Sequence, residues 1–575
     1  MMQTELSIAS KQSISSHWLK CFKGNQWLIL TVLLVVLFLL LIFLAAPLVA
    51  IIGQIYTEDR VNSSGWAAVS SYLSSASLLK SLANSLLVST LVTLIVIPLA
   101  FTFAYALTRS CMRFKGVMRS ITLLPLLAPS LLAAISLIYW FGNQGIAKSF
   151  WQLLGFESVY GASGIVLAEC FAIFPHVLMI IVTSLSLADG RLYEAAEAMG
   201  TSTLRKFFTV TLPSAKYGVI SASLVSFTLV MTDFGVPKIV GGDFDVLATD
   251  IFRLIIGQQD FQQGAVVALL LLLPALLTFV VDYFIRRKQT ASLSARAVTL
   301  VTKPKRNFDI AMTIYCVVIC GLMLAMFFMA VYASFVSFWP YNLNLSLLNY
   351  QSALIDSELG GAIINSLILA LGTTLIGTTV VFLGAYMLEK TKGFDFLRPL
   401  IRLLVMLPMA VPGLVLGLGY IFFFNAPSNP LNGLYQTMIL LIICTVIHFY
   451  TTSHMTMVTA LKAIDWEFEA VSASLKVPFY KTMWRVTLPI CLPSLLDISR
   501  YFFINAMTTI SAVIFLYSPE TQLASVAILN LDDAGDMGGA TAMAVMITAI
   551  SILVTGVYLL LGKLLHKRTQ RWRNS

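Results

Sequence analysis

The sequence has very little charge. Only 11% of its 575 residues are Asp, Glu, Lys or Arg, whereas 58% are hydrophobic. A soluble globular chain carries about a quarter charged residues, because polar groups must cover its surface in water. This composition excludes soluble enzymes, nucleic-acid-binding proteins and disordered scaffolds, and it indicates an integral membrane protein.

Motifs for catalysis and metal binding are also absent. The chain has no GxxxxGK[ST] phosphate-binding loop, no HExxH, no GxSxG and no CxxC among its 7 cysteines. It therefore offers no evident cradle for ATP, no zinc site and no disulfide framework. We expect no catalytic residue, no metal site and no cofactor in this chain, so any ATP would be used by another subunit.

Long apolar runs are abundant. A membrane-spanning helix needs about twenty mostly apolar residues, and the first run is too long for the apolar part of a signal peptide. We predict an all-α fold with twelve transmembrane helices at 27–52, 85–107, 119–141, 160–186, 217–240, 264–285, 310–334, 363–388, 400–424, 436–460, 494–517 and 540–562.

The basic residues predict the orientation of these helices. Most of the 37 Lys and Arg residues fall in the segments on one side of the spans. The positive-inside rule makes that side cytoplasmic and places both termini there. The other side is richer in acid, including Asp243, Asp532 and Asp536. This mildly favours cationic or zwitterionic solutes, although solvated loops would explain the acids equally well.

The two halves of the chain repeat each other. Matching segments are Asn84-Ser85-Leu86 with Asn365-Ser366-Leu367, Pro125 and Pro129 with Pro408 and Pro412, and Leu247-Ala248-Thr249 with Leu523-Ala524-Ser525. An even number of spans keeps both copies in one orientation. We predict parallel six-helix repeats at 27–285 and 310–562, a cytoplasmic linker at 286–309, a cytoplasmic N-terminal segment at 1–26 and a basic cytoplasmic tail at 563–575.

Each repeat has a patterned segment between its fourth and fifth spans. In the first repeat an Ala-rich stretch favours a helix, and Gly200 can supply a left-handed stop. A second helix can start at 201–203 and end at Leu212-Pro213. The expected product is a helix-turn-helix at the membrane surface, suited to a groove on a soluble partner. An ordinary amphipathic surface helix is the alternative for a single copy.

This segment occurs in both repeats and resembles the EAA loop of the inner-membrane permease subunits of binding-protein-dependent ABC importers, in a fused two-repeat form. The resemblance implies a type I importer permease fold in a bacterial inner membrane, with no enzymatic activity of its own. It also implies two copies of a cytoplasmic ATPase and a periplasmic solute-binding protein. It assigns ATPase docking to Glu194, Ala195, Ala196 and Gly200, and to Glu469 and Ala470 in the second copy, which is one residue longer and lacks the glycine.

Polar residues within the spans are costly to bury and are therefore candidates for a translocation pathway. Asp233 lies in a stretch with Gly235 and Pro237 that can break the helix and line a cavity. The matching stretch of the second repeat is neutral but carries hydroxyl groups. Helix packing is the alternative explanation for each residue. The candidates are Asp233, Ser511, Thr509, His176 and Glu169.

The substrate is inferred from resemblance alone. The segments 232–242, 246–251 and 511–536 are similar to those of fused permeases for 2-aminoethylphosphonate, and related fused permeases serve ferric iron. The ammonium group of 2-aminoethylphosphonate and the ferric cation would each be attracted by Asp233 and by the acidic outer loops. We expect import of 2-aminoethylphosphonate by alternating access, with ferric iron as the alternative. A secondary transporter driven by an ion gradient is a further alternative, but such a carrier needs no paired docking loops.

Overall fold

A computed structural model describes residues 26–55, 70, 72–292, 300, 302–355 and 357–569 of the chain. These residues are predominantly helical, which confirms the predicted all-α membrane fold. Of the predicted terminal segments, residues 1–25 and 570–575 lie outside the described residues. The sequence did not predict the antiparallel hairpin of β1 (Val336–Phe338) and β2 (Asn342–Leu345).

The first repeat contains thirteen of the labelled α-helices. They are α2 (Gln26–Leu40), α3 (Ala46–Ile55), α5 (Ala76–Arg109), α6 (Lys115–Thr122), α7 (Ser130–Phe141), α8 (Lys148–Leu153), α9 (Ala162–Ser186), α10 (Gly190–Ala198), α11 (Thr203–Lys206), α12 (Leu212–Thr232), α13 (Gly235–Val240), α14 (Leu247–Phe252) and α15 (Phe261–Ser292). Short turns of wider or tighter helix join some of them: η1 (Leu41–Ala45), η2 (Leu124–Leu127), η3 (Phe207–Thr211) and η4 (Arg253–Gly257).

The second repeat follows the same order. Its helices are α16 (Arg306–Phe335), α17 (Leu348–Ile355), α18 (Ser357–Glu389), α19 (Leu397–Met406), α20 (Gly413–Phe424), α21 (Met438–His448), α22 (Tyr450–Lys462), α23 (Glu467–Ser474), α24 (Phe479–Thr482), α25 (Leu488–Thr508), α26 (Ala524–Asp533) and α27 (Met537–Thr569). Its short turns are η5 (Leu407–Ala410), η6 (Asn432–Leu434), η7 (Met483–Thr487) and η8 (Pro519–Thr521). Helices α12 and α25 begin and end 276 residues apart, and so do α11 and α24.

The spans broadly match the predicted twelve. Within the described residues, 9 helices are long and apolar enough to cross a membrane, and two bent pairs, α19–α20 and α21–α22, bring the number to 11. The α19–α20 pair bends by 113° at its prolines. Helices α6 and α7 are its counterpart in the first repeat, with a bend at Pro125 and Pro129. Counting the bent pair α6–α7 as one more span brings the number to the predicted twelve.

Two predicted span ends were wrong. The fifth and eleventh spans end at Thr232 and Thr508 rather than at 240 and 517, because the backbone turns extended at the next residue in each repeat. Within the segment predicted as a linker, 286–309, α15 continues to Ser292 and α16 begins at Arg306. Helix α27 runs to Thr569, past the predicted start of the tail at 563.

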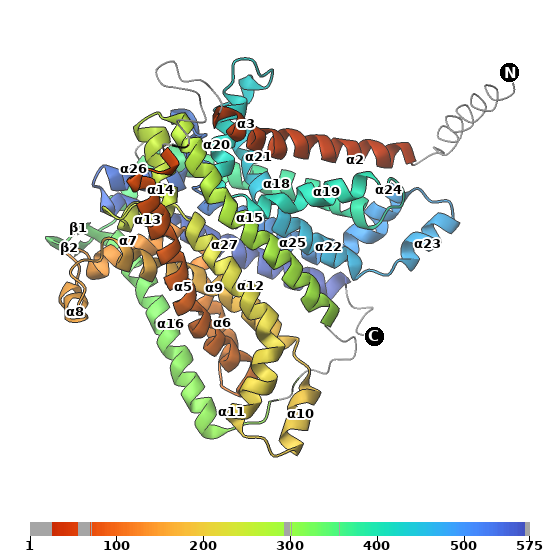
Figure 1. The fold of residues 1–575 in the computed structure, drawn as a ribbon, viewed down its shortest axis with the longest axis horizontal. Coiled ribbons are helices and arrows are strands. Elements are labelled where there is room, and N and C mark those ends of the chain that lie inside the picture. Colours follow the sequence, from red (N-terminus) through yellow and green to blue (C-terminus); the bar gives the residue numbers. More distant parts are fainter. Residues whose placement is uncertain are drawn as a thin grey trace.

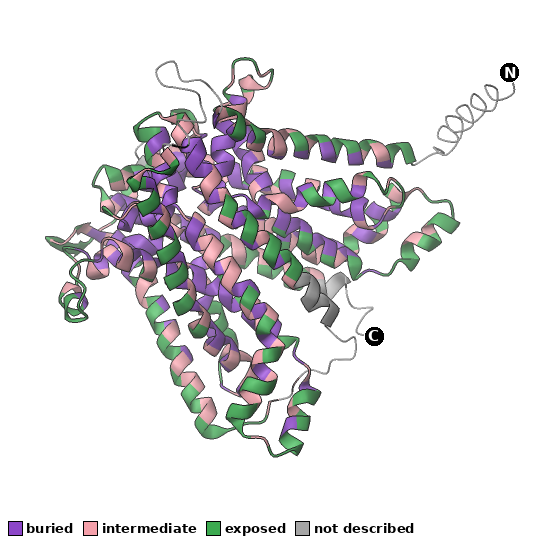
Figure 2. Cartoon of the chain, viewed as in Figure 1, coloured by how far each residue is buried: buried purple, intermediate pink, exposed green. Residues whose placement is uncertain are grey.

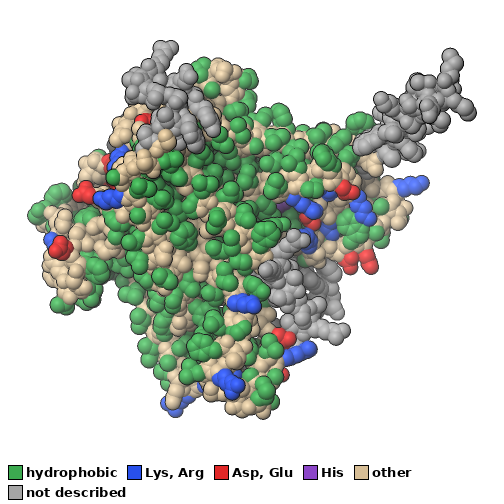
Figure 3. Space-filling view, viewed as in Figure 1, with side chains coloured by type: hydrophobic (Ala, Val, Ile, Leu, Met, Phe, Trp, Pro, Cys, Tyr) green, Lys and Arg blue, Asp and Glu red, His purple; other side chains and the backbone are tan. Residues whose placement is uncertain are grey.

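The two repeats form two arms that meet at one end and diverge at the other (Figure 1). We call the meeting end the hairpin end, because it carries β1–β2 with α13, α14 and α26. The other end is the loop end, where α10–α11 lie on one arm and α23–α24 on the other. Buried residues follow the interior of each arm, whereas α2 and α16 expose much of their outer faces (Figure 2). Apolar side chains cover the middle of the arms, and charged side chains gather toward the ends (Figure 3).

The first helix of each repeat packs on the other repeat. Helix α3 packs against α20, and α16 packs against α5, α6 and α7. The Tyr420 hydroxyl donates to Phe43 O at 2.7 Å, and the Tyr315 hydroxyl donates to Leu99 O at 2.8 Å. A Cβ atom on Gly419 would lie 2.7 Å from Pro47 O, so this close approach of α3 and α20 needs a glycine. The exchange joins the repeats along much of their length, since Asp309 Oδ1, near the start of α16, also accepts from Cys111 N at 2.8 Å.

The duplicated Asn-Ser pair holds the short helices at the hairpin end. In the first repeat Ser85 Oγ accepts a hydrogen bond from Leu247 N at 2.9 Å, and Asn84 Nδ2 donates to Asp245 O at 2.8 Å. In the second repeat Ser366 Oγ accepts from Ala524 N at 2.8 Å, and Asn365 Nδ2 donates to Gln522 O at 3.0 Å. Each pair satisfies backbone groups at the start of α14 or α26 that the helix cannot satisfy itself. In each repeat, therefore, the Asn-Ser segment contacts the start of the short helix, and both of these segments recur between the repeats in the sequence.

Candidate functional site

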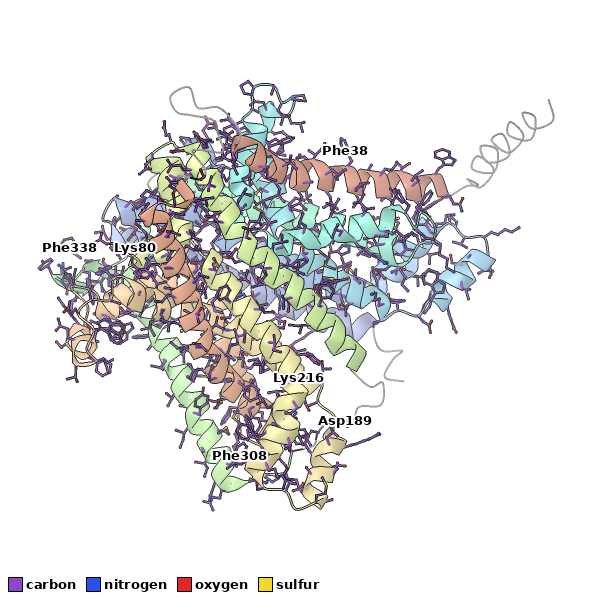
Figure 4. The ribbon with its side chains drawn as sticks, in the orientation of Figure 1. Phe38, Lys80, Asp189, Lys216, Phe308 and Phe338 are labelled. Carbon is purple, nitrogen blue, oxygen red and sulfur yellow. The ribbon has the colours of Figure 1, made fainter. Side chains whose placement is uncertain are left out.

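The predicted helix-turn-helix of the first repeat is present in the structure. Asp189 caps α10 by accepting from Arg191 N at 3.1 Å, and Ser202 caps α11 by accepting from Arg205 N at 3.4 Å. Gly200 between the two helices has φ +64°, a left-handed conformation in which a Cβ atom is strained. Figure 4 shows Asp189 at the loop end, with Lys80 and Phe338 near the hairpin end. The bend predicted at Gly200 is confirmed.

One detail of that prediction was wrong. Leu212-Pro213 does not end the second helix but begins α12, which continues from α11 through the wide turn η3. Proline is tolerated there because the wide turn and the helix start leave no bond that its missing N–H would have to make. The second helix of the loop and the fifth span therefore form one continuous helix, Thr203–Thr232, with the wide turn η3 within it.

The second repeat builds the same turn from different residues. Lys476 has φ +55° at the position that matches Gly200, and the surrounding hydrogen bonds correspond: Thr201 N donates to Ala196 O, and Val477 N donates to Ser472 O. Ala470 is therefore the counterpart of Glu194, and Glu469 is the counterpart of Tyr193. The extra residue predicted for the second loop arose from pairing Glu469 with Glu194.

The predicted docking residues differ in exposure. Glu194, Ala195, Gly200 and Ala470 are exposed, whereas Ala196 is buried beneath the first loop. The side chain of Glu469 is only 9% exposed, and its Oε2 lies 3.3 Å from Lys390 Nζ. Glu469 thus ties the loop to the arm rather than facing a partner, which departs from the role that the resemblance assigned to it.

A positively charged residue holds each loop against the second span of its repeat. Lys390, at the end of α18, pairs with Glu469 and donates to Ile464 O at 2.9 Å. Its counterpart Arg109 lies over the Tyr193 ring at 4.7 Å and donates to Leu185 O at 2.8 Å. The two anchors occupy one position and each lies over an aromatic ring, because Lys390 Nζ is also 5.7 Å from the Trp466 ring centroid, but Lys390 adds a salt bridge to this contact.

Sequence reasoning missed an apolar surface shared by both loops. It consists of four matched positions: Leu192 and Phe468, Met199 and Leu475, Leu204 and Tyr480, and Phe208 and Trp484. Met199 is 73% exposed and Leu475 is 71% exposed. Large apolar side chains that recur at matched exposed positions indicate a contact surface for a partner. The 276-residue spacing could have revealed them.

At the hairpin end the repeats touch through an ion pair and aromatic rings. Lys238 Nζ of α13 lies 2.9 Å from Asp533 Oδ1 of α26. Phe252 of α14 stacks on Phe515 of the second repeat with ring centroids 6.3 Å apart, and Phe234 packs on Phe252 at 5.0 Å. The repeats therefore touch at the hairpin end, whereas the helices of the two arms diverge toward the loop end (Figure 1).

A cavity of about 630 Å³ lies beside this contact and is lined by both repeats. Its walls include the aromatic rings of Tyr139, Tyr160 and Trp339 and the carboxyl groups of Asp532 and Asp536. Burial, together with the neighbouring Asp533, raises the pKa of Asp532 to about 6. Aromatic faces and carboxylates are the groups that hold ammonium cations. The cavity thus suits a small cationic group.

The structure brings together only some of the five predicted pathway residues. Asp233 follows the last residue of α12, and its carboxyl group lies within hydrogen-bonding reach of Glu169 on α9. His176 is exposed on α9, about two helical turns beyond Glu169 toward the loop end. In the second repeat Thr509 follows α25, and its carbonyl oxygen accepts from Ser525 Oγ at 2.6 Å. Ser511 packs closely on Gly413 of α20.

Paired arms that touch at one end and carry matched surface loops at the other define the membrane-spanning part of a transporter. The chain belongs to the family described as the binding-protein-dependent transport system inner membrane component. Two separate segments match this family, residues 96–290 and 380–567. Each segment covers most of one repeat, which confirms the duplication and the ABC permease class.

Two relatives match nearly the whole chain. The ferric transport system permease protein FbpB of Actinobacillus pleuropneumoniae is 26% identical over 549 residues, which are 93% of this chain and 78% of that protein. FbpB 1 of Haemophilus influenzae is 27% identical over 525 residues, covering 89% of this chain and 81% of its own length. The molybdenum transport system permease protein ModB of Mycobacterium tuberculosis is 27% identical over 241 residues, which are 42% of this chain and 88% of that protein. The chain thus resembles longer permeases along nearly its full length and shorter permeases along less than half of it.

Proposed function

We propose that this chain is the transmembrane permease of an ATP-driven importer for ferric iron. The similarity to ferric transport permeases along nearly the full length of the chain carries the choice of substrate. Carboxyl groups at the hairpin end and inside the first repeat support a cationic substrate, because a buried carboxylate needs a positive partner. The family match favours an ATP-driven importer over a gradient-driven secondary transporter.

The transport cycle follows from the two ends of the molecule. The loop end faces the cytoplasm of a bacterial inner membrane, with both termini on that side, because the basic residues gather there. Two copies of a cytoplasmic ATPase bind the loops α10–α11 and α23–α24. Their closure on ATP draws the arms together at the loop end and separates the repeats at the hairpin end, where a periplasmic solute-binding protein delivers the substrate.

A second candidate substrate is 2-aminoethylphosphonate. The cavity at the hairpin end supports it, since rings of Tyr139, Tyr160 and Trp339 beside Asp532 suit the ammonium group of that zwitterion. The phosphonate group has no such support: Lys238, beside the cavity, is already paired with Asp533. We therefore place ferric iron first.

Uptake in cells with and without the gene tests this proposal. Labelled ferric citrate and labelled 2-aminoethylphosphonate are supplied separately, under ATP depletion and under collapse of the ion gradients. We expect gene-dependent ferric uptake that stops when ATP is depleted and continues when the gradients collapse. Uptake of the phosphonate alone would make 2-aminoethylphosphonate the substrate in place of ferric iron. Uptake that stops when the gradients collapse at normal ATP would contradict an ATP-driven transporter.

A further inference from the structure

The first repeat places a buried carboxyl group beside a partly buried one within its membrane-spanning part. Glu169 is 1% exposed in the middle of α9, and its Oε1 atom has no hydrogen-bond partner within the described part of the chain. The other carboxyl belongs to Asp233, where the backbone leaves α12, and its Oδ2 accepts from Val236 N at 2.9 Å. The Glu169 and Asp233 carboxyl groups lie within hydrogen-bonding reach of each other.

Two carboxylates at this separation cannot both be ionised in a buried site, because their repulsion adds to the cost of desolvation. The hydrogen bonds indicate which group keeps a proton. Asp233 already accepts from a backbone N–H, which stabilises its charged form, whereas Glu169 has an oxygen without a donor. Glu169 therefore carries the proton and donates it to Asp233, and the pair has a net charge of about −1.

The surroundings of the pair hold few other titratable groups. Cys170 follows Glu169 on α9, His176 lies farther along that helix, Tyr139 is on α7, and Lys238 on α13 is occupied by Asp533. Within the described residues, no basic side chain bonds to either carboxyl. A buried negative charge without a cation is costly, so the pair has capacity for a positive ligand.

The second repeat shows that the fold does not need these acids. Thr445 and Thr509 stand at the matching positions, 276 residues later. Thr445 lies on α21, which is bent by 55° from α22, whereas the matching helix α9 is continuous. The Thr445 hydroxyl donates to Leu441 O at 2.8 Å within its own helix. The second repeat therefore folds with neutral hydroxyl groups at these two positions. A purely structural role would not explain why one repeat keeps two carboxyl groups in a membrane segment.

The pair also lies directly behind the contact between the repeats. Phe234, the residue after Asp233, is fully buried and packs on Phe252, which in turn stacks on Phe515 of the second repeat. A ligand bound at the carboxyl groups would therefore be one ring away from the surface that has to separate when the hairpin end opens.

We propose that Glu169 and Asp233 form a cation-binding site in the first repeat, at which an incoming cation displaces their shared proton. This inference rests on the proposed import of a cationic substrate. When the cation binds, the Glu169 O–H bond breaks, its electron pair stays on the carboxylate oxygen, and the proton leaves to water. No oxidation or reduction takes place. The ligand is a hard metal cation or an ammonium group, because both prefer carboxylate oxygens.

Infrared spectroscopy of the full chain in lipid tests the site. We expect a C=O stretching band from a protonated carboxyl group that shifts in heavy water and is lost in Glu169→Gln. Ferric citrate or 2-aminoethylphosphonate, added separately to the wild-type protein, should remove the band and release about one proton per chain. Matched controls are Thr445→Val and Thr509→Val, which should leave the band unchanged.

The outcomes separate this inference from the proposed function. Absence of the band in the wild-type protein, or a band that neither ligand removes, would overturn the site, even if cells import ferric iron. A band that a ligand removes would support the site, even if uptake assays overturn the choice of ferric iron. The wild-type titration needs no variant, so misfolding of Glu169→Gln or Asp233→Asn would not obscure the result.

Discussion

The two repeats share one backbone and differ in the chemistry they place on it. Helices α11 and α12 begin and end 276 residues before α24 and α25, and both loops turn through a left-handed residue, Gly200 in one and Lys476 in the other. Their anchors differ, however: Arg109 lies on an aromatic ring, whereas Lys390 forms a buried ion pair. Duplication has thus kept the geometry of each docking loop while the contacts that hold it have diverged.

The same divergence separates the membrane interiors of the two repeats. The first repeat places Glu169 and Asp233 where the second has Thr445 and Thr509. Helix packing tolerates both sets, so these positions are free to serve the substrate rather than the fold. The proposed function uses both features, with the matched loops binding the two ATPase copies and the carboxyl groups of the first repeat binding the substrate.

The largest expected effect comes from removing the anchor of the second loop. Lys390→Met leaves Glu469 buried without a partner, which should cost about 3–5 kcal/mol of stability. Arg109→Met removes a cation–π contact and one hydrogen bond, which should cost about 1–2 kcal/mol. Chemical denaturation in detergent measures both. Equal losses for the two variants would contradict the difference between the anchors.

The double variant Lys390→Met/Glu469→Leu sharpens that result. It removes both charges, so most of the lost stability should return. If the double variant were as unstable as Lys390→Met, the loss would come from the lysine side chain itself rather than from an unpaired Glu469.

The next effect concerns the apolar surface of the loops. Met199→Asp and Leu475→Asp each place a charge at a matched exposed position, which should weaken ATPase binding by about 2–4 kcal/mol, or roughly 30- to 1,000-fold. Co-purification and affinity measurements with the ATPase test this. Phe396→Asp is the matched control, because Phe396 is 88% exposed before α19 and outside both loops. If all three variants lost the same amount of ATPase affinity, the apolar surface of the loops would not be the ATPase contact.

A smaller effect distinguishes the two left-handed turns. Gly200→Ala should weaken ATPase binding by about 1 kcal/mol, roughly fivefold, because alanine is strained at positive φ. Lys476→Gly should have the opposite sign, since it relieves the same strain in the second loop. If both variants weakened binding alike, Lys476 would serve a role beyond its backbone conformation.

The pH of the hairpin side should shift the balance between closed and open repeats. Burial and Asp533 raise the pKa of Asp532 to about 6 from an ordinary value of 3.8. The charged form therefore destabilises the closed hairpin end above pH 6, and this penalty is lost as the pH falls through 6. Closure should strengthen between pH 7 and pH 5, as reported by a fluorophore placed at the cavity. Asp532→Asn should abolish that dependence, and an unchanged dependence would assign it to another group.

The smallest expected effect belongs to the exposed ion pair between the repeats. The side chains of Lys238 and Asp533 are 24% and 54% exposed, so Lys238→Ala should destabilise closure by at most about 1 kcal/mol, and added salt should reduce the difference. Opening at the hairpin end can be followed by cross-linking across the repeats. A loss of several kcal/mol would show that the pair is screened much less than its exposure indicates.

Much of the fold could be predicted from the sequence. Apolar runs located the spans, and the repeated segments located the duplication. Both signals can be read from a local stretch of sequence, because they depend only on the length of an apolar run and on the identity of its residues. The break after Thr508 was missed, since apolar residues continue past it. Gly235 and Pro237 indicated a break near Asp233, but the predicted span continued to 240, whereas α12 ends at Thr232. The hairpin β1–β2 was also missed, because strands of three and four residues show too little alternation to be recognised beside long apolar runs.

The site was predicted in part for a similar reason. Gly200 indicates its own turn, but Lys476 has the same conformation without any sequence signal. Backbone hydrogen bonds from Lys476 N to Ala473 O and from Val477 N to Ser472 O close that turn. Asp233 and Glu169 were each selected as costly polar groups in a membrane, yet their pairing joins α9 to the end of α12 and cannot be read from one chain segment. The predicted contacts of both with substrate, and those of His176, Thr509 and Ser511, stay predictions.

The distance between the docking loops tests the account most directly. Spin labels at Met199→Cys and Leu475→Cys report the loop end, and labels at Lys238→Cys and Asp533→Cys report the hairpin end, each in a chain whose native cysteines are replaced. On binding ATP to the complex with the ATPase, we expect the first pair to approach and the second pair to separate. Two distances that stay fixed, or that change in the same direction, would contradict alternating access between the repeats.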